Sequence, residues 1–261
     1  MLMGGPCMEK LYIIMPAYNE EANIETVARE WHEVVKGIGE TSKLVIIDDG
    51  SKDSTYQKLL DLKEQLPQLT PLTKPNGGHG ATLLFGYEYA LKEGADYIFQ
   101  TDSDGQTLSS EFPGFWEKRN QYDVLIGYRN HREDGFSRIM VTKVLKVVLR
   151  LIFGLKIADA NTPYRLMKRE VLQKYIVKVP KQFNLSNVML VVLFVEHKEK
   201  IKFLPITFRP RQGGVNSINL KKITRIGMRA VKDFRTIKRE MKKKDITTEE
   251  KTHCTSKQEQ I

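Results

Sequence analysis

Short apolar runs alternate with helical patterns through the first half of this chain. Strands are expected over five segments: Leu11 to Met15, Leu44 to Ile47, part of Pro67 to Thr73, Asp96 to Thr101 and Val124 to Gly127. Helices are expected between them, over Glu20 to Val35, Ser54 to Leu66 and Ala81 to Lys92. Strands that alternate with helices predict an α/β fold, with a mostly parallel central sheet flanked by helices.

The second half has a less regular pattern. Helices are expected over Arg138 to Phe153, Gln182 to His197 and Asn219 to Lys243, and a strand over Lys202 to Arg209. The helix that begins at Arg138 has a broad apolar face and a basic strip, which is typical of a helix in a membrane interface. A core helix whose lysines reach solvent would give the same pattern. From Asp245 the chain is polar and is expected to be disordered.

Charge is concentrated near the C-terminal end. The net charge is +10, and residues 221–244 alone carry eleven Lys or Arg against two acidic residues. Such a segment suggests an anionic partner surface, although a solvated terminal helix would look the same. Phe234 is its only aromatic residue, so a nucleic-acid surface is not expected.

Cysteine usage and hydropathy bear on location. Cys7 and Cys254 stand in no metal-binding or disulfide spacing, which favours a reducing compartment. The first residues lack the charged and apolar regions of a signal peptide. No segment approaches the length of a membrane-spanning helix. We therefore expect a cytoplasmic protein without a transmembrane segment, and a peripheral position at the cytoplasmic face of a membrane.

Four polar clusters follow the predicted strands or lead from them. They are Pro16 to Glu20, Asp48 to Asp53, Asn76 to Gly80 and Asp102 to Gln106. In open α/β sheets, ligands bind beyond the carboxyl ends of the strands, where these clusters are expected to meet. Asp102 and Asp104 project to the same side because side chains alternate along an extended chain. Together with the Gln106 amide oxygen, they suit Mg²⁺ or Mn²⁺ rather than zinc.

These motifs resemble family 2 glycosyltransferases of the GT-A fold, which use nucleotide-sugar donors. The resemblance rests on Pro-Ala-Tyr-Asn-Glu at 16–20, Asp-Asp-Gly-Ser-Lys-Asp at 48–53 and Asp-Ser-Asp at 102–104, and it covers residues 10 to 218. It implies a division into an N-terminal extension (1–9), a GT-A domain (10–218), a basic amphipathic helix (219–244) and a tail (245–261).

Further motifs are similar to the dolichyl-phosphate mannose synthase and polyprenyl-phosphate glycosyltransferase branch. They are the Asp-x-Asp-x-Gln pattern at 102–106, Arg129, Arg138, the segment 159–166 and the loop 211–217. Two positions depart from that branch. Pro163 stands where Gly is common, and Ile218 stands where that loop usually has a Lys that would contact a phosphate.

The resemblance implies roles for individual residues. The nucleotide sugar, GDP- or UDP-linked, would be bound by Pro16, Tyr18, Glu20, Asp48, Asp102 and Arg211. The metal, Mg²⁺ or Mn²⁺, would be held by Asp102, Asp104 and Gln106, with Asp104 central to catalysis. Asp49 and Asp53 would instead hold the turn, which Gly50 allows.

The acceptor implied by the resemblance is a polyprenyl phosphate at a membrane surface. Its phosphate needs no general base, and the implied acceptor-phosphate residues are Arg129, Arg132, Arg138 and Ser217. A soluble or cell-surface glycan hydroxyl would need a base, for which Asp159 is the candidate. Inversion is implied in either case. A third reading, of another class, is a module that binds anionic surfaces or nucleic acid.

Overall fold

The computed structural model describes residues 9–129, 136–181, 183 and 185–210, together with 231–232, 234–236 and 238–239. For residues 136–141 only the backbone is described. Three predicted site residues, Arg132, Arg211 and Ser217, lie outside these residues, as do the predicted tail and most of the predicted helix at 219–243.

The chain divides into two compact units. One comprises residues 1–135 and 158–216, and the other comprises 136–157 and 217–261. The predicted boundaries at 218 and 244 fall outside the described residues, so that domain division stays a prediction.

A seven-stranded sheet forms the centre of the first unit, in the order β3-β2-β1-β4-β6-β5-β7. The strands are β1 (Leu11–Ala17), β2 (Lys43–Asp48), β3 (Leu69–Thr73), β4 (Tyr97–Gln100), β5 (Val124–Arg129), β6 (Arg165–Lys168) and β7 (Ile201–Ile206). Among the strands of the described residues, only β6 runs antiparallel to its neighbours, β4 and β5. The prediction of a mostly parallel sheet is therefore confirmed.

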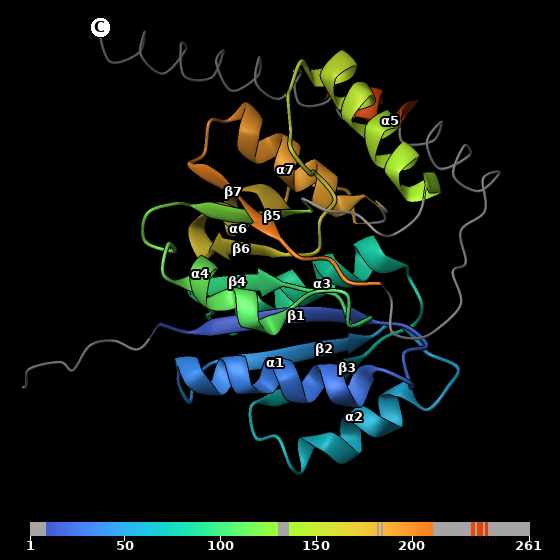
Figure 1. Cartoon of the computed structure of the whole chain (residues 1–261), viewed down its shortest axis with the longest axis vertical. Helices are drawn as coiled ribbons and strands as arrows, with labels where there is room; N and C mark the ends of the chain where they lie inside the picture. Colours follow the sequence, from blue (N-terminus) through green and yellow to red (C-terminus); the bar gives the residue numbers. More distant parts are fainter. Residues whose placement is uncertain are drawn as a thin grey trace, which may run out of the picture. The chain divides into compact units, whose positions relative to one another are not determined.

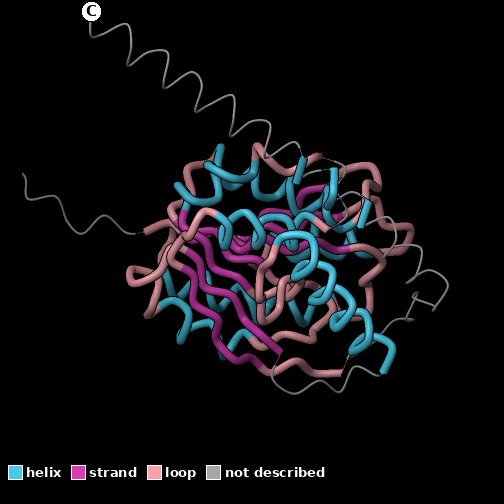
Figure 2. The backbone as a smooth tube through the Cα atoms, turned by 90° about the horizontal axis from the view of Figure 1, so that it is seen from above, coloured by secondary structure: helices cyan, strands magenta, loops and turns pink. Residues whose placement is uncertain are grey.

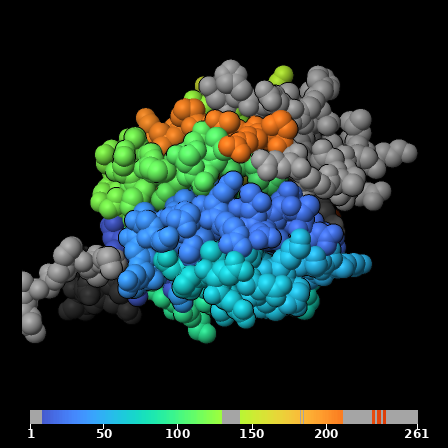
Figure 3. All heavy atoms as spheres, turned by 60° about the horizontal axis from the view of Figure 1, so that its bottom comes forward, coloured from blue at the N-terminus to red at the C-terminus, as the bar shows by residue number. Residues whose placement is uncertain are grey.

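Helices cover both faces of this sheet (Figures 1 and 2). They are α1 (Ile24–Ile38), α2 (Thr55–Lys63), α3 (His79–Lys92), the short η1 (Ser109–Glu111), α4 (Phe112–Trp116), α6 (Arg169–Ile176) and α7 (Ser186–Glu196). The core on one face joins α1, α2 and α4 to the strands, and α1 and α2 form much of the surface in Figure 3. On the other face α3 packs on β1 and contacts α6 and α7.

Side-chain alternation along the buried strands explains these two layers. All seven residues of β1 are buried, as expected for a central strand covered on both faces. Leu11, Ile13 and Met15 belong to the core under α1. An aromatic group extends this core, because Phe99 lies 5.3 Å from Trp31 between ring centroids and 4.7 Å from Tyr164.

The structure contains elements that the sequence pattern did not predict. These are η1 with α4, and β6 with α6. Pro113 and Gly114 within α4 are typical of a loop, and β6 has only four residues, the first of which is the fully buried Arg165. In both segments the spacing of apolar residues that normally predicts a helix or a strand is absent.

The second unit contains α5 (Phe136–Phe153), close to the predicted 138–153 helix. Phe153 meets Phe234 edge to face with ring centroids 5.9 Å apart, and Phe234 is fully buried. Among the residues described in either unit, none forms a helix long and apolar enough to cross a membrane.

Gly86 lets α3 approach the sheet closely. A Cβ atom at this position would lie 2.5 Å from Ile14 Cγ2 and 2.9 Å from Ile47 Cδ1. We expect Gly86→Ala to lower the free energy of unfolding by about 1–2 kcal/mol, because overpacking outweighs the gain in helix propensity. Urea denaturation measures this change.

Gly37→Ala provides the matched control. Gly37 also lies in a helix, α1, but an added Cβ would meet nothing within 4 Å. We expect this variant to be about 0.5–1 kcal/mol more stable than the parent. Opposite signs of the stability change at the two glycines would support the close packing at Gly86, and stabilisation by Gly86→Ala would contradict it.

Candidate functional site

A cavity of about 400 Å³ lies where the first two strands and β4 end. Loops that follow β1, β2 and β4 form its wall together with the start of α3. Its lining residues are Pro16, Ala17, Tyr18, Glu20, Asp49, Asn76, Gly78, His79, Thr82, Asp102, Ser103 and Asp104. The sequence-based expectation that these polar clusters meet at the carboxyl edge of the sheet agrees with this arrangement.

Backbone hydrogen bonds hold these loops in register. The Asp49 N–H donates to the Ala17 carbonyl at 2.8 Å, and the Thr101 N–H donates to the Ile14 carbonyl at 3.2 Å. The Ser103 hydroxyl donates to the Pro16 carbonyl at 2.8 Å. The cavity wall is therefore fixed by the sheet rather than by side-chain contacts alone.

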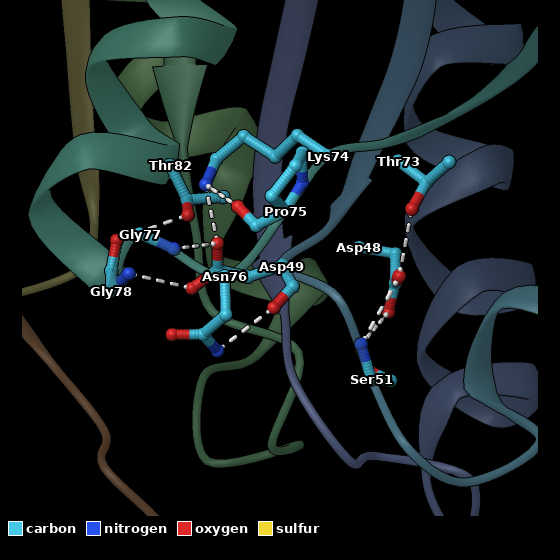
Figure 4. Close-up of polar contacts among 10 residues, drawn as sticks. All are labelled: Asp48, Asp49, Ser51, Thr73, Lys74, Pro75, Asn76, Gly77, Gly78 and Thr82. Carbon is cyan, nitrogen blue, oxygen red and sulfur yellow. Dashed lines mark hydrogen bonds and ion pairs between the residues drawn. The ribbon is translucent and has the colours of Figure 1, made fainter.

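Asp49 organises the loop that leads into α3. Its carboxylate accepts hydrogen bonds from the Gly77 and Gly78 N–H groups at 2.9 and 2.8 Å, and it pairs with the Lys74 ammonium (Figure 4). The Asn76 side-chain amide donates to the Asp49 carbonyl at 2.9 Å. The pKa of Asp49 is lowered: burial acts to raise it, but Lys74 and the Gly77 N–H together outweigh burial.

Gly50 makes this contact between loops possible. Its φ of +67° lies in the left-handed region, and an added Cβ would come within 3.0 Å of the Asn76 backbone nitrogen. A side chain would be strained in that conformation and would also push the 74–76 loop away. The predicted turn roles of Asp49 and Gly50 fit this geometry.

Asp48 points away from the cavity. Its carboxylate accepts from the Ser51 N–H at 3.2 Å and from the Thr73 hydroxyl at 3.0 Å, and the residue is only 2% exposed (Figure 4). Asp49 lines the cavity, whereas Asp48 is not among its lining residues. A direct contact between Asp48 and a nucleotide base stays a prediction, and the geometry gives Asp48 a role in holding the turn.

Tyr18 and Glu20 lie on the β1 side of the cavity. Tyr18 is 43% exposed, so its ring is available at the rim. Glu20 is buried and accepts a hydrogen bond from the Asn23 amide at 3.1 Å, close to the start of α1. Pro16 contributes to the wall beside them. Their contacts with a nucleotide stay predictions.

Asp102 and Asp104 lie side by side in the cavity wall. The Oδ1 atom of Asp102 is buried without a hydrogen-bond partner among the described residues, and it lies 4.0 Å from His79 Nε2. Burial, and secondly the charge of Asp104, raise the pKa of Asp102 above its usual range. Two adjacent carboxylates that repel each other form a site that a cation would stabilise.

Gln106 anchors the loop that carries these two carboxylates. Its backbone N–H donates to Asp104 Oδ1 at 3.1 Å, and its side-chain amide donates to the Arg209 carbonyl at 2.8 Å. Gln106 is 2% exposed and is not among the cavity-lining residues. Ligation of a metal by Gln106 stays a prediction.

The donor set fits a divalent cation that keeps other oxygen ligands. Within the described residues, no group of three or more His, Cys, Asp or Glu side chains could hold a metal. Asp102 and Asp104 supply carboxylates, and the unpartnered Asp102 Oδ1 gives one ready ligand atom. Mg²⁺ and Mn²⁺ are commonly held by one or two carboxylates together with water and substrate phosphates. A cation bound here would stabilise a leaving diphosphate.

Arg129 and Asp159 form a paired contact outside the cavity lining. Arg129 Nε donates to Asp159 Oδ2 at 2.7 Å, and an Nη of the same guanidinium donates to Oδ1 at 2.9 Å. Their side chains are 10% and 6% exposed, and the guanidinium lies over the Phe208 ring. The sequence proposed both residues for the acceptor side, and the structure brings them together.

Arg165 is a buried charge for which the sequence predicted no catalytic or binding role. It is fully buried, and its guanidinium donates to the carbonyls of Thr162 at 2.7 Å and Asn187 at 3.0 Å. These contacts hold the backbone that follows Asp159. Only its position in the 159–166 motif could have drawn attention to it. The Arg138 side chain is not described, so its role stays a prediction.

A family model for glycosyl transferase family 2 matches residues 12–176. The chain belongs to glycosyl transferase family 2. This match includes the cavity residues from Pro16 to Asp104 and extends through Asp159 and Arg165.

The chain also resembles curated bacterial proteins. The undecaprenyl-phosphate 4-deoxy-4-formamido-L-arabinose transferases of Salmonella paratyphi B and Salmonella newport are each 23% identical over 168 residues. The match covers 63% of this chain and 50% of each relative. The chain thus spans about half the length of the curated relatives it matches.

Solved structures share the fold. Glucosyl-3-phosphoglycerate synthase from Mycobacterium tuberculosis, solved with Mn²⁺, UDP and glucosyl-3-phosphoglycerate, superposes with a TM-score of 0.63 at 15% identity over 84% of this chain and 76% of that one. Its complex with Mn²⁺ and UDP-glucose gives the same TM-score at 18% identity, over 85% and 77%. The predicted GT-A fold is confirmed.

The ion pair between Lys74 and Asp49 should stabilise the fold. Both side chains are largely buried, at 14% and 5% exposure. We expect Lys74→Met to lower the free energy of unfolding by about 2–3 kcal/mol, because it leaves a buried carboxylate without its cation. Lys36→Met is the control, since Lys36 pairs with Glu33 at the surface and should change stability by under about 1 kcal/mol.

The loss of unfolding free energy in Lys74→Met should become smaller as the pH is lowered. The folded protein lowers the pKa of Asp49, so its stabilising contribution is present above the unfolded pKa and disappears as pH falls through the folded value. The gap between the parent and Lys74→Met should therefore narrow in acid. A gap that widens on acidification would contradict the assignment.

Proposed function

We propose that this protein transfers a sugar from a nucleoside-diphosphate sugar to a polyprenyl phosphate at the cytoplasmic face of a membrane. The observation that carries the proposal is the cavity at the carboxyl edge of the sheet, where Asp102 and Asp104 meet the loop held by Asp49 in a family 2 chain. The names of the Salmonella relatives support an acceptor of the polyprenyl phosphate class.

The donor would occupy the cavity with its diphosphate toward Asp102 and Asp104. A divalent cation, Mg²⁺ or Mn²⁺, would neutralise the charge of the departing nucleoside diphosphate. Pro16, Tyr18 and Glu20 would surround the nucleoside on the β1 side. In the reaction, an acceptor phosphate oxygen forms a bond to the anomeric carbon while the bond from that carbon to the diphosphate oxygen breaks, with inversion.

The paired contact between Arg129 and Asp159 favours a phosphate acceptor. Both Asp159 oxygens accept hydrogen bonds from one guanidinium, and Oδ1 also accepts from the Asn161 N–H at 3.3 Å. A base role for Asp159 would require this pair to separate first, because both carboxylate oxygens are already engaged in hydrogen bonds. A sugar hydroxyl acceptor would require a general base to remove its proton, whereas an ionised phosphate acceptor would not.

Asp104→Asn tests the cation site. We expect metal-dependent release of nucleoside diphosphate to fall by about 100-fold or more, because the charge that holds the cation is removed. The assay uses Mn²⁺ or Mg²⁺, a panel of GDP- and UDP-sugars and a short polyprenyl phosphate. Asp61→Asn, an exposed carboxylate on α2, is the matched control and should keep full activity. Full activity in Asp104→Asn would remove this assignment.

Asp159→Asn separates the two acceptor classes. With a phosphate acceptor we expect kcat to fall by less than about ten-fold. The KM for the acceptor should rise, because Asp159 no longer holds the Arg129 guanidinium in position. Loss of a general base would instead lower kcat by about 10²–10⁴-fold. The second result, together with transfer that needs no lipid phosphate, would move the acceptor to a glycan hydroxyl.

A further inference from the structure

Helix α5 presents an exposed face made of two parallel stripes. Lys143, Lys146 and Arg150 are exposed, and each is followed by an exposed apolar residue: Val144, Val147 and Leu151. The three apolar side chains are 50%, 56% and 80% exposed. Because both sets follow the i, i+3, i+7 spacing, each forms a stripe along the helix, and the two stripes are adjacent.

Other positions of α5 are already covered. Leu149 is 1% exposed, and Phe153 packs on Phe234. The Lys238 ammonium donates a hydrogen bond to the Ile152 carbonyl and lies 5.7 Å from the centroid of the Phe153 ring. Phe153 ends the line of the basic stripe, whereas the six side chains of the two stripes before it are exposed.

The charge of this segment is entirely positive. Residues 136–157 contain five Lys or Arg and no Asp or Glu. A second copy of this face would bring like charges together, and nucleic acid would leave the apolar stripe in water. Anionic headgroups beside an apolar layer satisfy both stripes at once.

We propose that the exposed face of α5 docks on a lipid bilayer that carries anionic headgroups. The helix has 18 residues and is thus about 27 Å long, but its three basic side chains would be costly in the hydrocarbon core. It would lie along the interface, with Val144, Val147 and Leu151 inserted among the acyl chains. The proposal rests on the proposed function only for its purpose, which is to bring the enzyme to a lipid-borne acceptor.

Vesicle binding tests this directly, without donor or acceptor. The full chain is sedimented with vesicles of neutral phosphatidylcholine, or of phosphatidylcholine with phosphatidylglycerol. We expect binding to the anionic vesicles that weakens as salt is raised. The double variant Val147→Ser/Leu151→Ser should bind about ten-fold or more weakly, because it removes most of the inserted apolar surface.

A second variant tests the basic stripe. Lys143→Gln/Lys146→Gln should reduce binding to anionic vesicles by about 25-fold, at about five-fold for each basic residue near the surface. Binding to neutral vesicles should not change. The matched controls are Val177→Ser, which alters a 79% exposed apolar side chain elsewhere, and Lys63→Gln/Lys92→Gln, which removes two exposed charges from α2 and α3.

Several outcomes would overturn the proposal. They are absence of vesicle binding by the parent, parental binding by both α5 variants, or equal losses in the controls. A dimer that dissociates in the Ser variant would assign the face to a second copy, and a salt-sensitive shift of labelled RNA lost in the Gln variant would assign it to nucleic acid. Thermal melting confirms that the variants fold, as expected for changes at exposed positions.

Failure of the proposed function would look different. Transfer to a short, water-soluble polyprenyl phosphate without vesicles should be unchanged in both α5 variants, because the substitutions lie outside the cavity. A chain that binds anionic vesicles but transfers no sugar would retain the docking surface and lose the proposed function. A chain that transfers sugar but ignores vesicles would retain the function and lose the docking surface.

Discussion

The parallel alignment of β1, β2 and β4 is the constraint on which the site depends. β1 pairs with β2 on one side and with β4 on the other, so the loops that follow these strands emerge at one edge. Hydrogen bonds from Asp49 to Ala17 and from Ser103 to Pro16 then tie those loops together. The buried strands supply the rigidity that lets two mutually repelling carboxylates, Asp102 and Asp104, remain close.

Buried ionic groups around this edge have different tasks. Asp49 uses Lys74 and two backbone N–H groups to shape the loop at the start of α3, and it also faces the cavity. Arg165 has no such charge partner among its hydrogen bonds, which go to backbone carbonyls. Both arrangements hold nearby backbone in place. Removing the partners of either charge would leave that charge buried and uncompensated, which would destabilise the fold.

The strands and polar clusters at the carboxyl edge of the sheet could be predicted from the sequence, because short local patterns encode them. Apolar runs and the polar clusters behind them identified β1, β2 and β4, and alternation placed Asp102 and Asp104 together. The sequence assigned the nucleotide to Asp48 and the turn to Asp49, and it could not show that Asp49 lines the cavity, since the partners Thr73 and Lys74 lie 25 residues further along the chain. Strand β6 was not predicted because it has only four residues and begins with a buried Arg. The hydrogen-bond partner of that Arg at Asn187 lies far along the chain and is brought close only by folding.

In the proposed function, the contact between Arg129 and Asp159 bears on the choice of acceptor. Asp159 precedes β6 and Arg129 ends β5, and these strands are antiparallel neighbours. Asp159 is the candidate base for a hydroxyl acceptor, and Arg129 is a candidate contact for an acceptor phosphate. The Arg129 guanidinium holds the Asp159 carboxylate. Such a pair suits a reaction in which the nucleophile arrives already ionised, because the protein then needs to place positive charge and has no proton to remove. A phosphate-bearing acceptor meets that requirement, and a neutral sugar hydroxyl does not.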